Sequence, residues 1–250
     1  GFQLDFNRRA TSGRLAEILG RHPVGWRELT VHLKDKTVAD ADLLLRTMGL
    51  RRAAEACLPR HSAAARAALD AYSDGVTQAL RRHRPLEARL LRYEPEPWSA
   101  VDSLTIVRGM AFELSMSWRS VLMFDALAHR LGDDPERLRA LLPAWPDLPA
   151  PPAKWAELRA HAADSVAVEE AIRTFTATGG AHLGSNAWVV SGARTTTGRP
   201  IVASDPHLML SAPTPHFPMH LACPDLEVAG ACVPGIPGVV FGHNRDVAWG

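Results

Sequence analysis

The residue best suited to chemistry in this sequence is a serine at the boundary between two kinds of pattern. Ser185 lies in the run Gly184-Ser185-Asn186-Ala187-Trp188, where a charged helical pattern gives way to a strand pattern. A serine hydroxyl is a weak nucleophile until a neighbouring base takes its proton. Gly and Ser are also ordinary turn residues, so this run alone does not separate an active serine from a turn.

Two further motifs follow Ser185 along the chain. His207 stands 22 positions after the serine, within Ser204-Asp205-Pro206-His207-Leu208. The other motif is Gly242-His243-Asn244, which follows the run Gly238-Val239-Val240-Phe241. A histidine after a proline is by itself typical of a surface turn. The three motifs in this order carry more information than any one of them.

Together, the three motifs resemble the penicillin acylase family of N-terminal nucleophile (Ntn) hydrolases. The resemblance covers the whole chain, although members of the family are considerably longer. The matching segments in the first half are residues 5–9, 13–20, 71–76, 93–98 and 102–103. Proteins of this family are made as one precursor that cuts itself immediately before a serine. The resemblance therefore implies a cleavage site between Gly184 and Ser185.

A serine at the N-terminus of a chain carries both a nucleophile and a base. Its α-amine has an unperturbed pKa of about 7.7–8.0, so it takes the hydroxyl proton near neutral pH, directly or through a water. While Ser185 remains joined to Gly184, that nitrogen is part of a peptide bond, and the chain is expected to be an inactive zymogen. The resemblance implies that Ser185 attacks the Gly184 carbonyl and that hydrolysis of the resulting ester frees the amine.

The resemblance assigns further roles by position. It makes His207 a group that orients the nucleophile or its amine, rather than the main base. Asn186 and Trp188 are expected to fix the strand that presents Ser185. His243 and Asn244 are expected to be structural residues beneath the site.

Five residues fall where the family lines its acyl pocket: Met110, Glu113 and Leu114 from the helical part, and Leu208 and Phe241 from the strand part. The apolar four equally fit ordinary core packing. Glu113 departs from the cationic or neutral residue that is usual there in penicillin G acylases. A buried carboxylate would disfavour an acidic acyl group.

No metal or other cofactor is expected. Many members of the family bind calcium through a Glu of the first chain, but residues 117–121 offer no carboxylate where that Glu would fall. The sequence also has no His-Glu-x-x-His run and no paired Cys spacing, the patterns of zinc sites. The family's two oxyanion donors would fall beyond residue 250, so the 250 residues alone are expected to be inactive.

The elements that must position these residues divide the chain near residue 180. The last 70 residues carry only seven charged residues but eight of the 18 Gly and eight of the 19 Pro, which predicts strands and turns. We therefore predict an α/β chain of the α+β kind, with a mainly helical segment over 1–142 and the first strands of a sheet over 185–250. Residues 143–184 are predicted to be a Pro-rich connector or an excised spacer peptide. The resemblance implies the αββα fold of Ntn hydrolases.

Periodicity predicts the individual elements. Apolar residues at helical spacing begin near residue 2 and stop at Gly20. Further helices are predicted over 40–57, 62–82, 118–131 and 154–175, with Ser62 as an N-cap. Another is predicted to run through Leu114, with Ser99 or Asp102 at its start. Strands 187–191 and 200–204 are predicted to form a hairpin, and more strands are predicted over 216–222, 226–233, 238–242 and 246–249.

Composition excludes several classes of protein. A net charge of +1 lacks the electrostatic footprint of a nucleic-acid binder. No apolar stretch reaches the roughly 18–20 residues of a membrane span. Three Cys at unrelated spacings argue against a disulfide framework.

The resemblance implies an amidohydrolase that cleaves a non-peptide amide through an acyl ester on Ser185. Its small-molecule substrate would be an acyl amide, such as a β-lactam side chain, as in antibiotic biosynthesis, an N-acyl homoserine lactone, as in quorum quenching, or an acylated peptide. The working enzyme would be an α/β heterodimer cut from one precursor, periplasmic or secreted. The alternatives are a non-catalytic fragment or degenerate paralogue that acts as a helical scaffold, and a helical interaction module.

Overall fold

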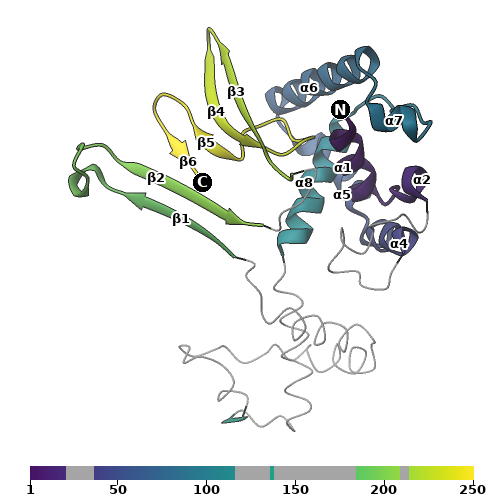
Figure 1. The fold of residues 1–250 in the computed structure, drawn as a ribbon, viewed down its shortest axis with the longest axis horizontal. Coiled ribbons are helices and arrows are strands. Elements are labelled where there is room, and N and C mark those ends of the chain that lie inside the picture. Colours follow the sequence, from purple (N-terminus) through teal and green to yellow (C-terminus); the bar gives the residue numbers. More distant parts are fainter. Residues whose placement is uncertain (21–36, 116–135, 138–183, 209–213) are drawn as a thin grey trace. The chain divides into compact units, whose positions relative to one another are not determined.

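Five stretches of the chain are described by the computed structural model: residues 1–20, 37–115, 136–137, 184–208 and 214–250 (Figure 1). The chain divides into two compact units, one of Gly1–Ala111 with Leu183–Gly250 and one of Phe112–His182. Most described residues belong to the first unit. The predicted helices 118–131 and 154–175, the segment 117–121 and the connector up to residue 183 lie outside the described residues.

The described part of the first 115 residues, called here the helical segment, contains seven α-helices. They are α1 (Phe2–Ser12), α2 (Ala16–Leu19), α4 (Val38–Met48), α5 (Leu50–Cys57), α6 (Ala63–Arg82), α7 (Leu86–Leu90) and α8 (Ala100–Leu114). A 3₁₀ turn, η1 (Leu58–Arg60), follows α5.

Side-chain caps explain where two of these helices begin. The Ser62 hydroxyl accepts a hydrogen bond from the Ala65 N–H at 3.2 Å, which confirms the predicted N-cap of α6. Before α8, the Ser99 N–H donates to the Asp102 carboxylate at 2.8 Å, and the Asp102 N–H lies 3.4 Å from the Ser99 hydroxyl. This reciprocal pair is a capping box with Ser99 as the N-cap, which selects the first of the two predicted starts.

The prediction of one helix over 40–57 is wrong. Gly49 takes a left-handed conformation, with φ of 71°, and ends α4 while α5 begins at Leu50. This conformation is open to glycine at little cost, whereas a side chain would be strained there. The sequence therefore bends at Gly49 into two helices.

The described strands form two separate sheets. Strands β1 (Gly184–Val190) and β2 (Ile201–His207) pair antiparallel, joined through the 3₁₀ turn η2 (Gly192–Arg194), and Figure 1 draws them as a long two-stranded ribbon. Strands β3 (Phe217–Cys223), β4 (Leu226–Cys232), β5 (Phe241–His243) and β6 (Ala248–Trp249) form an antiparallel meander in chain order. We refer to residues 185–250 as the strand segment.

The hairpin and the order of the strands agree with the sequence prediction, but several strands begin or end elsewhere; β6, predicted over 246–249, begins only at Ala248. Strand β1 begins at Gly184 rather than at residue 187, so Ser185 lies inside it. The predicted strand 238–242 is wrong in extent, because the Gly238 N–H bonds to the Ile236 carbonyl in a turn and β5 begins only at Phe241. The mixture of helices and sheet confirms the α+β class; the αββα layering remains a prediction.

Among the described residues, buried apolar side chains gather in two clusters. One contains Val76, Leu80, Trp98, Ile106 and Val233, and the other contains Leu15, Val38 and Ala41. The first cluster joins the two segments, because Val233 comes from the strand segment and the others come from α6, from α8 and from Trp98, two residues before α8. It is the main core of the described structure.

Helix α1 carries three buried charged residues, Asp5, Arg8 and Arg9. Asp5 is fully buried and pairs with Arg8 and with Arg9, whose Nε lies 3.1 Å from the carboxylate. Arg8 also donates to the Pro97 carbonyl at 3.0 Å and lies over the Trp98 ring at 5.2 Å. These contacts bind α1 to the stretch that leads into α8. Among the described helices, none is long and apolar enough to cross a membrane.

Candidate active site

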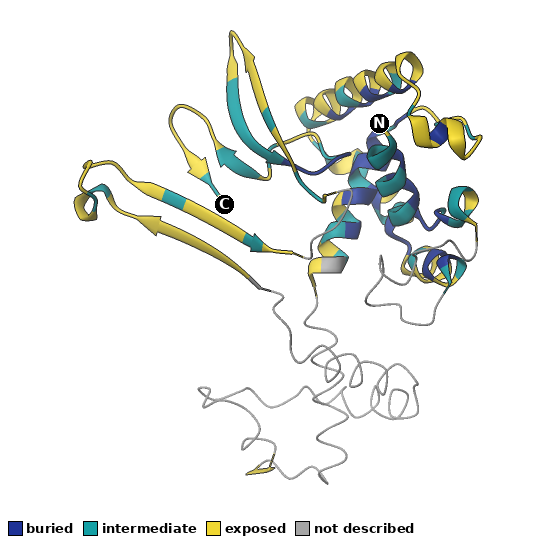
Figure 2. Cartoon of the chain, viewed as in Figure 1, coloured by how far each residue is buried: buried dark blue, intermediate teal, exposed yellow. Residues whose placement is uncertain are grey.

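Ser185 is the second residue of β1 and lies opposite Pro206 on β2. In the same register Gly184 lies opposite His207, and Asn186 lies opposite Asp205. Ser185 is solvent-exposed, as is most of this ribbon, which Figure 2 colours largely yellow. The ribbon therefore brings the predicted cleavage site and the predicted orienting histidine to the same end of one strand pair.

His207 has two polar neighbours at this end of the ribbon. Its Nε2 lies 2.7 Å from the Asp205 carboxylate and 3.5 Å from the amide nitrogen of Asn186. The side chains of His207 and Asp205 are 43% and 67% exposed. The carboxylate therefore fixes the ring through Nε2, while water reaches both partners.

The register also determines which face each side chain occupies. Residues opposite each other in an antiparallel pair project to the same face, and neighbours along a strand alternate. Asn186, Asp205 and His207 therefore share one face, as their contacts require, and Ser185 projects to the other with Pro206. In the uncut chain, His207 shares its face with the position of Gly184.

Sequence reasoning used Asp205 only as part of a motif and missed its contact with His207. The signal was present, because a residue two positions before a histidine on a strand lies on the same face. The pairing of Asn186 with Asp205 needed the register of the hairpin, which the sequence did not determine.

The predicted acyl-pocket residues are not brought together around Ser185 in the described structure. Met110 packs against the main core, and Phe241 meets the His216 ring edge-on at 5.0 Å between centroids. Leu208 is 39% exposed and Leu114 is 62% exposed. Of Glu113 only the backbone is described. Burial lowers the pKa of His216, so a neutral imidazole is favoured beside Phe241.

The remaining predicted residues have local roles in the structure. The Asn244 side-chain oxygen accepts from the N–H groups of Asp246 at 2.9 Å and Val247 at 2.7 Å, which closes the turn between β5 and β6. His243 Nδ1 lies 3.2 Å from the Asn244 carbonyl oxygen. Trp188 lies on β1 and is 64% exposed.

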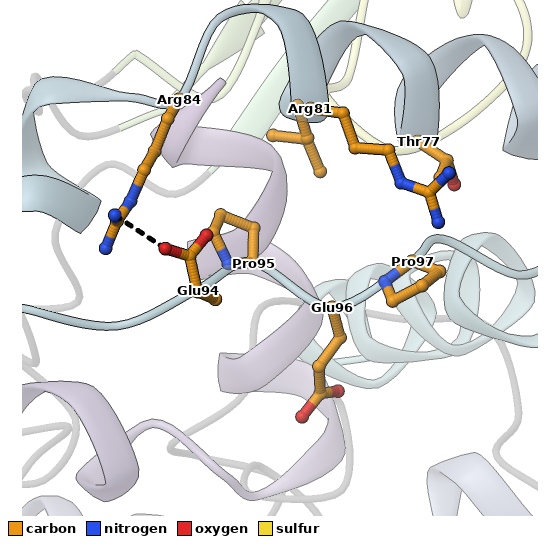
Figure 3. Close-up of a pocket in the computed structure, with 8 residues that line it drawn as sticks. Thr77, Arg81, Arg84, Glu94, Pro95, Glu96 and Pro97 are labelled. Atoms are coloured by element: carbon orange, nitrogen blue, oxygen red, sulfur yellow. Dashed lines mark ion pairs between the residues drawn. The ribbon is translucent and has the colours of Figure 1, made fainter.

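A cavity of about 200 Å³ lies away from all of these residues. Figure 3 shows it between α6 and the extended stretch before α8, with Arg84 paired to Glu94 at 2.6 Å. Its lining residues are Thr77, Leu80, Arg81, Arg84, Glu94, Pro95, Glu96 and Pro97. None of them belongs to the predicted site, and half of them carry charge, so nothing links this cavity to the predicted acyl pocket.

No group of three His, Cys, Asp or Glu side chains suited to a metal ion occurs within the described ranges. The stretch 117–121, which bears on calcium, is outside them.

Comparison with known proteins gives one consistent result. The family model for penicillin amidase matches residues 1–250. Penicillin acylase 2 proenzyme from Pseudomonas sp. (strain SE83) is 34% identical over 99% of this chain and 31% of its own length. Acyl-homoserine lactone acylase QuiP from Pseudomonas aeruginosa is 30% identical over 97% of this chain and 28% of its own length. The chain thus spans about a third of these relatives.

Proposed function

The chain belongs to the penicillin amidase family, and we propose that it supplies the nucleophile, Ser185, of an acylase that is activated by cleavage between Gly184 and Ser185. The observation that carries this proposal is the position of Ser185. It is exposed at the start of β1, in the ribbon whose other strand ends with His207. The name of one relative, a proenzyme, agrees with activation by cleavage.

Self-cleavage would proceed by transfer of the Gly184 acyl group from nitrogen to oxygen. The Ser185 hydroxyl oxygen attacks the Gly184 carbonyl carbon, so that a C–O ester bond forms and the C–N bond breaks. The hydroxyl proton passes to the departing nitrogen. Water then hydrolyses the ester, which leaves Gly184 as a carboxylate and Ser185 with its hydroxyl and a free amine.

Turnover would use the new amine as the base. The amine takes the Ser185 hydroxyl proton as the oxygen attacks the acyl carbonyl of the substrate, and the proton is delivered to the leaving amine. Water releases the acid from the acyl ester in a second step. The substrate class is a linear amide, either the side-chain amide of a β-lactam or an N-acyl homoserine lactone, as the names of the relatives suggest.

The strand register supports a specific role for His207. Cleavage after Gly184 leaves the Ser185 amine at the start of β1. This amine is next to the former position of Gly184, which lies opposite His207. Because Ser185 projects to the opposite face, His207 is better placed to orient the amine than the hydroxyl. The Asp205 carboxylate, 2.7 Å from Nε2, would leave Nδ1 for this contact.

The test is a comparison of Ser185→Ala with Ser204→Ala in the full-length protein. Ser204 lies opposite Ala187 on the same ribbon and on the same face as Ser185, so it is a matched control. We expect Ser185→Ala to remain uncut and to hydrolyse neither a phenylacetyl amide nor an N-acyl homoserine lactone, and Ser204→Ala to do both. Normal turnover by Ser185→Ala would contradict the proposal and favour a non-catalytic role for this serine.

A further inference from the structure

The loop between β4 and β5 leaves the sheet and enters the core of the helical segment. Val233 is 8% exposed and belongs to the same cluster as Val76, Trp98 and Ile106, and Ile236 packs against that cluster. The helical segment up to Ala111 and the strand segment accordingly fall within one compact unit. Residues 233–236 are called the anchor loop below.

Helical side chains also hold the backbone of the anchor loop. The Tyr72 hydroxyl oxygen, on α6, accepts from the Gly235 N–H at 3.2 Å, and the Asn7 amide, on α1, donates to the Pro234 carbonyl at 3.0 Å. Burial raises the pKa of Tyr72, which keeps the phenol neutral and able to serve in this contact. The loop thus has apolar and polar partners on two different helices.

The fit at the centre of the loop requires glycine. Gly235 has φ of 101°, and a Cβ there would lie 3.2 Å from a Trp98 ring carbon and closer still to the Ile106 side chain. The loop is closed on itself by the Ile236 N–H, which donates to the Val233 carbonyl at 3.0 Å. The anchor loop is therefore a closed turn whose Gly235 lies against the side chains of Trp98 and Ile106.

We propose that the anchor loop is the element by which the strand segment keeps the helical segment bound after the chain is cut. This inference rests on the proposed function, in which cleavage before Ser185 leaves the two segments without a covalent link. The loop also lies near two residues predicted to line the acyl pocket. Met110 packs against the cluster that contains Val233, and Phe241 begins the strand that follows the loop. Loss of the anchor would separate these residues.

The experiment cuts the chain independently of its own chemistry. A protease site is inserted immediately before Gly184, in a Ser185→Ala background with an affinity tag at the N-terminus, and the protein is cut and captured through the tag. We expect the C-terminal piece to be captured with the tagged piece. Gly235→Ala should weaken its retention at least about tenfold, because a Cβ in this conformation is both strained and blocked.

Two further variants separate the anchor from a general folding defect. Gly238→Ala is the matched control, since a Cβ at Gly238 would meet nothing within 4 Å, and it should retain the C-terminal piece as the parent does. Tyr72→Phe removes one hydrogen-bond acceptor without changing the shape of the core, and it should weaken retention about fivefold. If Gly235→Ala does not fold, the retention of the C-terminal piece by Tyr72→Phe alone decides whether the proposal holds.

The proposal is overturned if the parent pieces separate on cutting, or if Gly235→Ala and Tyr72→Phe both retain the C-terminal piece as well as Gly238→Ala does. These outcomes do not depend on Ser185, because the protease makes the cut. A failure of the proposed function would instead appear as an uncut wild-type chain whose pieces still stay together after cutting with the protease.

Discussion

Two tryptophans, Trp98 and Trp188, show how differently the helical segment and the strand segment bury their side chains. Trp98 is 5% exposed, lies under Arg8 and donates from its indole N–H to the Ser103 hydroxyl at 3.0 Å. Trp188, three residues after Ser185, is 64% exposed on β1. Figure 2 shows the same contrast between the blue interior of the helices and the yellow β1–β2 ribbon.

This difference indicates that stability and the proposed chemistry are carried by different regions. The helical segment contains most of the buried apolar residues and provides hydrogen-bond partners for its buried carboxylates, and it contacts the anchor loop. Among the described strands, β1 pairs with β2 alone, so the ribbon presents Ser185 and the Asp205–His207 contact with little packing around them. Substitutions in the two regions should therefore differ in whether they affect folding or function.

The largest difference is expected between the tryptophans themselves, in the 250-residue chain. Trp98→Ala should lower the free energy of unfolding by about 3–5 kcal/mol, because it empties a buried site. Trp188→Ala should change it by no more than about 0.5 kcal/mol, as for other exposed side chains. Urea unfolding of both variants measures this, and equal losses would contradict the contrast between the regions.

A smaller effect is expected at the buried carboxylate of α1. Asp5→Asn removes the charge that Arg8 and Arg9 share and should cost about 2–3 kcal/mol. Glu55→Gln is the control, because the Glu55–Arg51 pair at 3.3 Å is exposed and should contribute less than about 1 kcal/mol. Thermal unfolding of the two variants gives the comparison, and a loss at Glu55 as large as that at Asp5 would refute it.

The smallest effect concerns pH. The hydrogen bond from Arg14 lowers the pKa of Glu96 to about 2, from an ordinary value of 4.5. Because the folded-state pKa is depressed, the stability that this pair contributes is present above pH 4.5 and is lost as the pH falls toward 2.

The Glu96 side chain is 46% exposed, so solvent screening should limit that contribution to less than about 1 kcal/mol. Denaturant unfolding between pH 5 and 2 measures it. Glu96→Gln should flatten part of the decline in stability across this range, and an unchanged decline would show that Arg14 does not perturb this carboxyl.

Local signals made much of the fold predictable. Ser62 and the Ser99–Asp102 pair mark helix starts by their own hydrogen bonds, so the sequence locates α6 and α8 well. The break at Gly49 was missed because glycine also occurs inside helices, and only the left-handed conformation of the folded chain identifies the turn.

The site was less predictable, because it depends on contacts between distant parts of the chain. The motif around His207 made it a candidate, but the contact with Asp205 and the separation of His207 from the Ser185 face follow from the strand register. The anchor loop was not foreseen at all. Nothing local in residues 233–236 specifies that Val233 will pack against Val76 and Trp98.

The central claim is that Ser185 becomes the N-terminus of a second chain, and intact-mass analysis with N-terminal sequencing of the purified full-length protein tests it most directly. We predict two chains, the second of which begins Ser-Asn-Ala-Trp, as residues 185–188 read. A single uncut chain, or a cut at a different bond, would contradict the account.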